Sequence, residues 1–183
     1  MSASLRRDDL LLERIVPMSR LVSRVLLWLF VINLGIAFGA GLYESEIVFP
    51  RWLVGSPENG YYWDAEAAKA DNTGLRFWVY VTTGPLTLIT LANLVAAWRH
   101  HGMARSWWLA SAVAALADRA FTLSYFIPTM IALMGGGMSP TGAIEAARQW
   151  ETLNYARHAI VLLAWLLALK AFAEFHREGR LLV

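Results

Sequence analysis

The sequence contains no cysteine and few charged residues. Without cysteine the chain cannot form disulfides, iron–sulfur clusters or a thiolate-ligated haem, and it lacks the cysteine pairs of thiol oxidases. Charged residues make up 16% of the 183 residues, against about 25% in an ordinary soluble domain. The formal net charge of +2 is too small to indicate nucleic-acid binding. Hydrophobic residues make up 57% of the chain, a composition typical of an integral membrane protein.

Four long apolar runs follow one another, each long enough to cross a hydrocarbon core of about 30 Å. They cover residues 21–43, 76–98, 107–134 and 151–175. We therefore predict an all-α fold, an integral membrane antiparallel four-helix bundle that forms one domain over residues 21–175. Residues 45–75 form its outer loop, and residues 176–183 form a cytoplasmic tail. Residues 1–20 mix charged and apolar side chains, which predicts an amphipathic cytoplasmic segment on the membrane surface.

Two signals predict the orientation in the membrane. Lys and Arg gather before the first span, between the second and third spans, and after the fourth, whereas the other two loops are mainly acidic. By the positive-inside rule both termini are cytoplasmic, and we expect a bacterial inner (plasma) membrane. Tryptophans are typical of the two interfaces: Trp28, Trp98, Trp107 and Trp108 at the inner level, and Trp52, Trp63, Trp78 and Trp150 at the outer level.

Short local patterns predict three further features. The polar, alanine-rich stretch Asp64 to Asp71 predicts a short helical turn inside the outer loop. Ser139-Pro140 is typical of a helix start. Gly35 and Gly39 lie four residues apart and allow close helix approach, so we expect a homo-oligomer associating through the small residues of the first span.

Every span carries a stripe of polar residues at helical spacing, and it is energetically unfavourable for such a stripe to face lipid. They are therefore expected to face one another and to converge in the outer half of the bundle: Glu44, Thr82, Thr83, Tyr125, Thr129, Asn154, Arg157 and His158.

Charged residues near mid-membrane need partners, because each costs roughly 2.5 to 3.5 kcal/mol on insertion scales. Asp118 and Arg119 lie there. They can form an interior ion pair or hydrogen bonds to Asn33 and Asn93, or they can take part in a proton relay. At the outer end, Glu44 and Arg157 could form a second buried pair.

His158 is the only histidine within a predicted span. A neutral imidazole there can be a general base, a haem ligand or a metal ligand, and a hydrogen-bonded core histidine is the structural alternative. The sequence has no His-x-x-x-His or Glu-x-x-His pairing, so it indicates no metal site beyond a ligand from His158. Glu44 and Glu46 are two residues apart and cannot face each other on one helix, which argues against a paired-carboxylate site.

Three sets of short motifs stand in or beside the spans: Val48-Phe49-Pro50 after the first; Arg119-Ala-Phe-Thr122 and Ile127-Pro128-Thr129 in the third; and Trp150, Asn154 and Arg157 at the start of the fourth. In these motifs the chain resembles the anthrone oxygenase-like family of small four-span membrane proteins. Met130 stands where that family commonly has Asn, a difference that bears on the substrate. The resemblance implies oxidation of polycyclic aromatic anthrones to quinones with molecular oxygen, without an established cofactor.

That chemistry needs a base and a cation that holds the enolate oxygen. Deprotonation of the acidic C–H gives a carbanion that reacts with oxygen directly. We expect His158 as the base, Arg157 and Asn154 as oxyanion partners, and Tyr125 as a further donor. The residues expected to bind the substrate are Glu44, Thr82, Thr129, Trp150, Trp165 and Arg119.

The predicted function is therefore a membrane-embedded oxygenase or oxidoreductase of a lipophilic, anthrone-like molecule. Two other classes stay open. One is a haem- or metal-binding membrane protein, an isomerase or electron carrier, with His158 as ligand. The other is a non-enzymatic lipophile-binding or assembly protein. The expected partners are a lipophilic small molecule and the lipid bilayer, without nucleic acid, and the cofactor is either none or a haem on His158.

Overall fold

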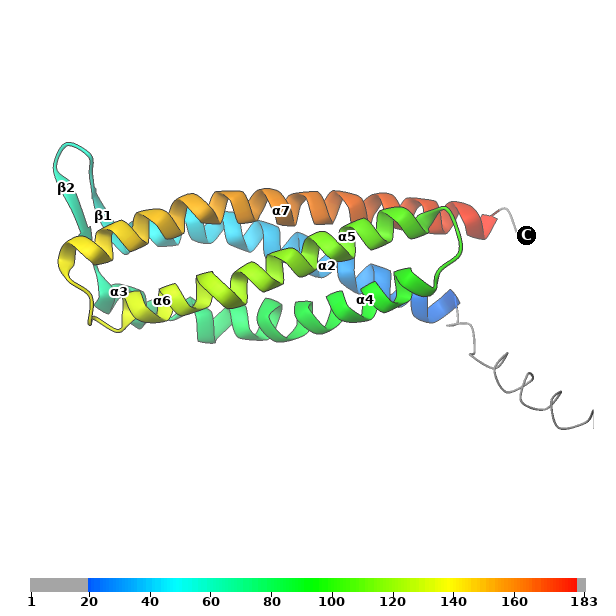
Figure 1. The fold of residues 1–183 in the computed structure, drawn as a ribbon, viewed down its shortest axis with the longest axis horizontal. Helices are drawn as coiled ribbons and strands as arrows, with labels where there is room; N and C mark the ends of the chain where they lie inside the picture. Colours follow the sequence, from blue (N-terminus) through cyan, green and yellow to red (C-terminus); the bar gives the residue numbers. More distant parts are fainter. Residues whose placement is uncertain (1–19, 181–183) are drawn as a thin grey trace, which may run out of the picture.

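The computed structural model describes residues 20–180, and four helical rods form most of them (Figure 1). The first rod is α2 (Arg20–Tyr43), η1 (Glu44–Val48, a π-helical turn) and η2 (Phe49–Arg51, a 3₁₀ turn). The second is η3 (Gly74–Leu86, π-helical) and α4 (Thr87–Arg99). The third is α5 (Ala104–Phe121), η4 (Thr122–Phe126, π-helical) and α6 (Ile127–Met134). The fourth is the single helix α7 (Pro140–Arg180).

The rods run alternately up and down and pack as a closed ring. Helix α2 packs against α4 and α7, and α5 packs against the same two helices. The starts of α2 and the end of α7 lie at one end of the bundle, and a β-hairpin lies at the other (Figure 1). Apolar side chains that include Phe30, Leu34 and Leu86 fill the middle, each 0% exposed.

Within residues 20–180, three helices are long and apolar enough to cross a membrane: Arg20–Arg51, Gly74–Arg99 and Pro140–Arg180. The third rod carries Asp118 and Arg119 at its middle and is not one of these three. The prediction of a mainly helical chain is confirmed, and these three helices are consistent with an integral membrane protein. The amphipathic segment predicted for residues 1–20 lies, apart from Arg20, outside the described residues, as do residues 181–183.

The outer loop is more structured than predicted. The first rod continues to Arg51, and a two-stranded antiparallel hairpin follows, β1 (Leu53–Ser56) and β2 (Gly60–Trp63). Gly60 has a φ of +79°, which suits the tight turn because glycine has no Cβ. The prediction of an all-α chain is therefore wrong for these residues, since four-residue strands carry too short a pattern to be recognised.

The short helix predicted inside the loop is present as α3 (Ala65–Asp71). Asp64 caps it, because its Oδ1 accepts a hydrogen bond from the backbone N–H of Ala67 at 2.9 Å. The predicted start of the fourth helix is also present: Ser139 Oγ accepts from the N–H of Gly142 at 3.2 Å, and Pro140 is the first helical residue.

Helix α7 begins well before residue 151, where the fourth span was expected to begin. Its 41 residues extend over about 60 Å, about twice the thickness of a hydrocarbon core. Its first turns therefore stand beyond the apolar part of the bundle, where they pack against the hairpin (Figure 1).

A cluster of aromatic side chains, the aromatic cap, joins these turns to the loop. Phe49 stacks on Trp150 with ring centroids 5.0 Å apart and an interplanar angle of 7°. Each of its tryptophans also donates one hydrogen bond from Nε1: Trp52 to Asp71 Oδ2 at 3.0 Å, Trp63 to the Leu133 carbonyl at 3.0 Å, and Trp150 to the Phe126 carbonyl at 3.2 Å. These three tryptophans are buried inside the protein and therefore do not face lipid.

The small residues of the first span serve packing within this chain. A Cβ at Gly35 would lie 3.2 Å from Cε2 of Trp165 in α7, whereas a Cβ at Gly39 would meet nothing within 4 Å. Ala37 is 7% exposed. Gly35 thus packs against α7, whereas the surface at Gly39 is open.

We predict that Phe49→Ala lowers the free energy of unfolding by about 3 to 5 kcal/mol, because it leaves a cavity inside the aromatic cap. Ile47→Ala is the control, since Ile47 precedes Phe49 by two residues, lies outside the aromatic cap and is 52% exposed. Thermal unfolding of both variants in detergent measures the difference. Equal losses would contradict a structural role for the aromatic cap.

Candidate functional site

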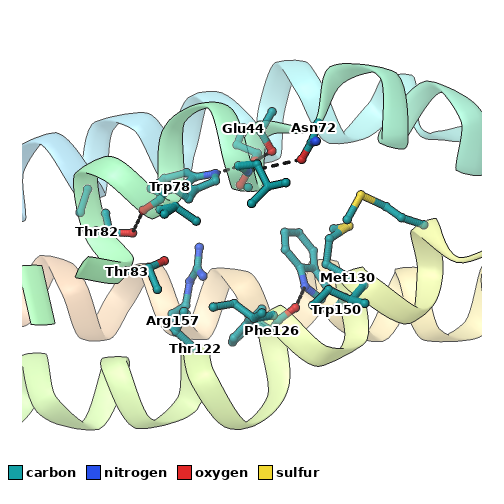
Figure 2. A pocket seen from close by; sticks show the side chains of 18 of the residues that line it. Glu44, Asn72, Trp78, Thr82, Thr83, Thr122, Phe126, Met130, Trp150 and Arg157 are labelled. Carbon is teal, nitrogen blue, oxygen red and sulfur yellow. Dashed lines mark hydrogen bonds between the residues drawn. The ribbon is translucent and has the colours of Figure 1, made fainter. Parts of the chain in front are cut away.

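A cavity of about 470 Å³ opens in the hairpin half of the bundle, between the first, second and third rods and α7 (Figure 2). Its polar or charged lining residues are Glu44, Lys69, Asn72, Thr73, Thr82, Thr83, Arg119, Thr122, Arg157 and His158. Most of the remaining surface is apolar and includes Trp78, Val79, Phe126, Ile127, Met130, Met134, Trp150 and Val161. This volume and lining are typical of a site for a small lipophilic molecule.

Three of the four rods are π-helical where they border the cavity, over Glu44–Val48, Gly74–Leu86 and Thr122–Phe126. A π-helical turn is wider than an α-helical one and shifts the direction of the side chains that follow it, and such turns occur frequently at functional sites. Pro85 lies inside the second of these segments and has no N–H to donate to the preceding turn.

Glu44 forms one wall of the cavity and is 6% exposed. Its Oε1 accepts two hydrogen bonds, from Thr73 Oγ1 at 2.6 Å and from Trp78 Nε1 at 2.8 Å. Oε2 forms no hydrogen bond with any described residue. The carboxylate is therefore held in place by one oxygen, and its second oxygen is available to a ligand.

Arg157 projects from α7 on the opposite wall (Figure 2). Its guanidinium lies 4.6 Å from the centre of the Phe126 ring. Within the part of the chain that the structure describes, it forms no hydrogen bond and has no carboxylate within 4.0 Å. The expectation that Glu44 and Arg157 form a direct pair is wrong, because Glu44 bonds to the second rod instead.

His158 faces α2 and forms part of a short hydrogen-bonded chain. Asn154 Nδ2 donates to Ser45 Oγ at 2.8 Å, and Ser45 Oγ lies 2.9 Å from His158 Nε2. Nε2 is thus already hydrogen-bonded to Ser45, and His158 is only 4% exposed.

Asp118 and Arg119 pair with each other: Arg119 Nε donates to Asp118 Oδ2 at 2.9 Å, and Arg119 Nη2 donates to the same oxygen. They do not bond to Asn33 or Asn93, as one interpretation expected. Asn93 instead donates to the carbonyls of the first and second rods and accepts from Trp108. Arg119 Nη1 and Asp118 Oδ1 remain buried without a partner among the described residues, and Arg119 lines the cavity.

The residues expected at the site divide into two sets. Those that line the cavity are Glu44, Thr82, Arg119, Trp150, Arg157 and His158. Those that do not are Asn154, which positions Ser45; Tyr125, which packs on Phe121 and Phe126; Thr129; and Trp165, which packs on Gly35 and Phe38. Tyr125 and Trp165 are thus not placed to contact a molecule in the cavity.

Sequence reasoning missed Ser45, Thr73, Trp78 and Phe126. Trp78 was expected only as an interface residue. In the structure its Nε1 donates a hydrogen bond to Glu44 in the cavity wall. Ser45 had no signal, because it follows Glu44 directly and neighbours on a regular helix point in different directions. Its contact with α7 depends on the π-helical turn that begins at Glu44.

Comparison of the chain with family models, with curated proteins and with solved structures finds no match. The described residues contain no group of three or more His, Asp or Glu side chains that could hold a metal ion.

We predict that Gly41→Ala disrupts the link between His158 and Ser45. A Cβ at Gly41 would lie 2.6 Å from His158 Cε1, so the ring must move, at a cost of about 1 to 3 kcal/mol. Gly39→Ala is the matched control on the same helix, because its Cβ meets nothing, and it is expected to be neutral or stabilising by up to about 1 kcal/mol. Thermal unfolding measures both.

The double variant Gly41→Ala/His158→Ala tests the cause. Removal of the imidazole should recover most of the loss that Gly41→Ala adds. Additive losses would show that His158 is not what the new methyl group displaces.

Proposed function

We propose that this protein is a membrane-embedded oxygenase that acts on a lipophilic, aromatic, anthrone-like molecule bound in the cavity. The observation that carries the proposal is the placement of Glu44 and Arg157 on opposite walls of an apolar cavity, each with hydrogen-bonding capacity left over (Figure 2). A base and a cation are the two groups that oxidation through an enolate requires.

The membrane setting rests on the three apolar helices and on the chemistry of the third rod. Asp118 and Arg119 are buried and neutralise each other, so the rod does not present them to lipid. We infer a four-span antiparallel bundle in a bacterial inner membrane. The basic residues between the second and third rods and at the end of α7 support cytoplasmic termini by the positive-inside rule.

The side chains that line the cavity indicate the chemistry of the ligand. Aromatic and thioether side chains favour a flat, polarisable ring system. The unpaired Arg157 guanidinium favours a ligand oxygen that carries or develops negative charge, because an unpaired charge in apolar surroundings is costly. A polycyclic aromatic ketone with an acidic C–H meets both requirements.

The reaction balances with molecular oxygen as oxidant. The base removes one proton from the ring CH₂ group, and Arg157 stabilises the enolate oxygen. The carbanion transfers an electron to O₂, the two radicals join to form a peroxide anion, and the protonated base returns its proton to give a hydroperoxide. Loss of the second C–H proton with cleavage of the O–O bond releases water and leaves the new C=O, so one oxygen atom enters the quinone and the other leaves as water.

Two side chains can take the first proton. His158 was the expected base, yet its Nε2 is already hydrogen-bonded to Ser45 Oγ. Glu44 is fixed through Oε1 and has Oε2 unused. The geometry therefore favours Glu44 as the base and gives His158, with Ser45 and Asn154, the task of holding α7 against α2.

We predict that Arg157→Met lowers turnover of anthrone by about 100-fold or more, since it removes the oxyanion partner. Glu44→Gln should cause a loss of about 100-fold or more if Glu44 is the base, and His158→Gln a smaller one. Oxygen uptake and anthraquinone absorbance measure turnover against a protein-free blank, with Arg148→Gln as control because Arg148 stacks on Tyr61 outside the cavity. Unchanged turnover in both Arg157→Met and Glu44→Gln would exclude the proposed chemistry.

The haem or metal alternative has a specific test. His158 is the ligand it requires, and coordination through Nε2 would have to replace the Ser45 hydrogen bond. A visible spectrum of the purified protein with a Soret band that disappears in His158→Ala would establish the haem. Loss of thermal stability in the Arg157 and Asn154 variants, with no turnover of anthrone by the wild type, would instead favour a binding or assembly protein.

A further inference from the structure

A second hollow lies at the opposite end of the bundle, where α2 begins and α7 ends. It has a volume of about 430 Å³ and is lined by Arg20, Arg24, Phe175, His176, Gly179 and Arg180. We call it the cationic hollow. Three guanidinium groups and one imidazole line it, and no carboxylate of residues 20–180 does.

Two neighbouring carboxylates, Glu174 and Glu178, bond to groups outside the hollow. Glu174 accepts from Lys170 Nζ at 2.7 Å and lies 3.6 Å from Arg177. Glu178 lies 3.0 Å from His100 Nε2 and accepts from the Ala104 N–H at 2.8 Å. Neither is available to neutralise the cationic hollow.

The arginines of the hollow converge from two helices. A Cβ at Gly179 would lie 3.6 Å from Arg20 Nη2, so the Arg20 guanidinium reaches from α2 across to α7. Arg20 and Arg24 are four residues apart on one helix face, where like charges repel. None of the three arginines has an ion-pair partner among residues 20–180. Such a cluster is stabilised when an anion occupies it.

His176 adds a further polar contact. Its Nδ1 lies 2.9 Å from the Phe172 carbonyl and must donate the proton there, because a carbonyl only accepts. Nε2 is then left for a bound group.

An exposed apolar strip continues from the hollow along α2. Leu21, Val25, Trp28 and Ile32, spaced four, three and four residues apart, are 67%, 47%, 48% and 49% exposed. Arg24 lies one turn before Trp28 on the same side of the helix. A negatively charged group beside an exposed apolar strip is the chemistry of an anionic phospholipid.

We propose that the cationic hollow binds the phosphate of an anionic phospholipid, with an acyl chain along the strip of α2. The charge complementarity and the position of the strip select a lipid over a soluble anion, and basic pockets between helices at the cytoplasmic side are known sites for such headgroups. The proposal rests on the membrane setting inferred above and is independent of the oxygenase chemistry.

The experiment uses the full chain, delipidated in a neutral detergent, and titrates it with dioleoyl phosphatidylglycerol, dioleoyl phosphatidylcholine or inorganic phosphate. Native mass spectrometry measures the bound lipid, and thermal unfolding measures the stabilisation. We expect saturable binding and stabilisation with phosphatidylglycerol alone. Equal effects of phosphatidylcholine, or a full effect of phosphate alone, would overturn the proposal.

The triple variant Arg20→Gln/Arg24→Gln/Arg180→Gln should bind phosphatidylglycerol roughly 100-fold more weakly. Its matched control is Arg99→Gln/Arg105→Gln/Arg177→Gln, which changes the charge equally at the same end but outside the hollow. If the triple variant does not fold, Arg24→Gln against Arg99→Gln serves, with about a fivefold loss expected. Equal losses in variant and control would mean that only the overall charge matters and would refute the site.

Alkaline extraction of the membrane fraction separates the two kinds of failure. Release of the protein would refute the membrane setting itself. Retention without selective binding of phosphatidylglycerol would refute the lipid site alone, and neither result bears on anthrone turnover.

Discussion

The hydrogen bonds of two neighbouring side chains hold the hairpin half of this bundle together. Glu44 bonds to Thr73 and Trp78 of the second rod and the loop before it, and Ser45 bonds to Asn154 and His158 of α7. Neighbours on a helix point in different directions, so a single position on the first rod reaches two other rods. These bonds form in apolar surroundings, where an unsatisfied polar group is costly. The width of the cavity depends on them.

The same need for partners in apolar surroundings explains how most charged groups near the cavity are accommodated. Asp118 and Arg119 neutralise each other on one helix, and Glu44 is satisfied by two neutral donors. Arg157 lacks such partners among the described residues, and the face of Phe126 lies 4.6 Å from its guanidinium. A side chain that the fold leaves unsatisfied in this way is a candidate for contact with a ligand.

The two ends of the bundle differ in structure. At the hairpin end, the aromatic cap closes the rods over the cavity, and its tryptophans are buried and hydrogen-bonded. At the other end, Trp28 and Trp98 are exposed, and the basic side chains of α2 and α7 surround an open hollow. Between the two ends, α2 lies close to α7. Gly35 leaves room for Trp165 there, and Gly41 leaves room for His158.

The sequence by itself determined the helical elements. The lengths of the apolar runs, the Ser139-Pro140 start, the helical stretch Asp64 to Asp71 and the polar face of each rod follow from composition and from local sequence patterns. The sequence also brought Glu44, Arg157 and His158 to the same half of the bundle. Only the tertiary structure decided which of these groups bond to each other. Helical periodicity gives the face of a residue but not the rotation and axial position of one rod against another, and long side chains reach several partners from one face. Asp118 therefore bonds to its neighbour in sequence rather than across the bundle, Glu44 bonds to Trp78 rather than to Arg157, and the hairpin forms because distant rods provide the aromatic cap on which it packs.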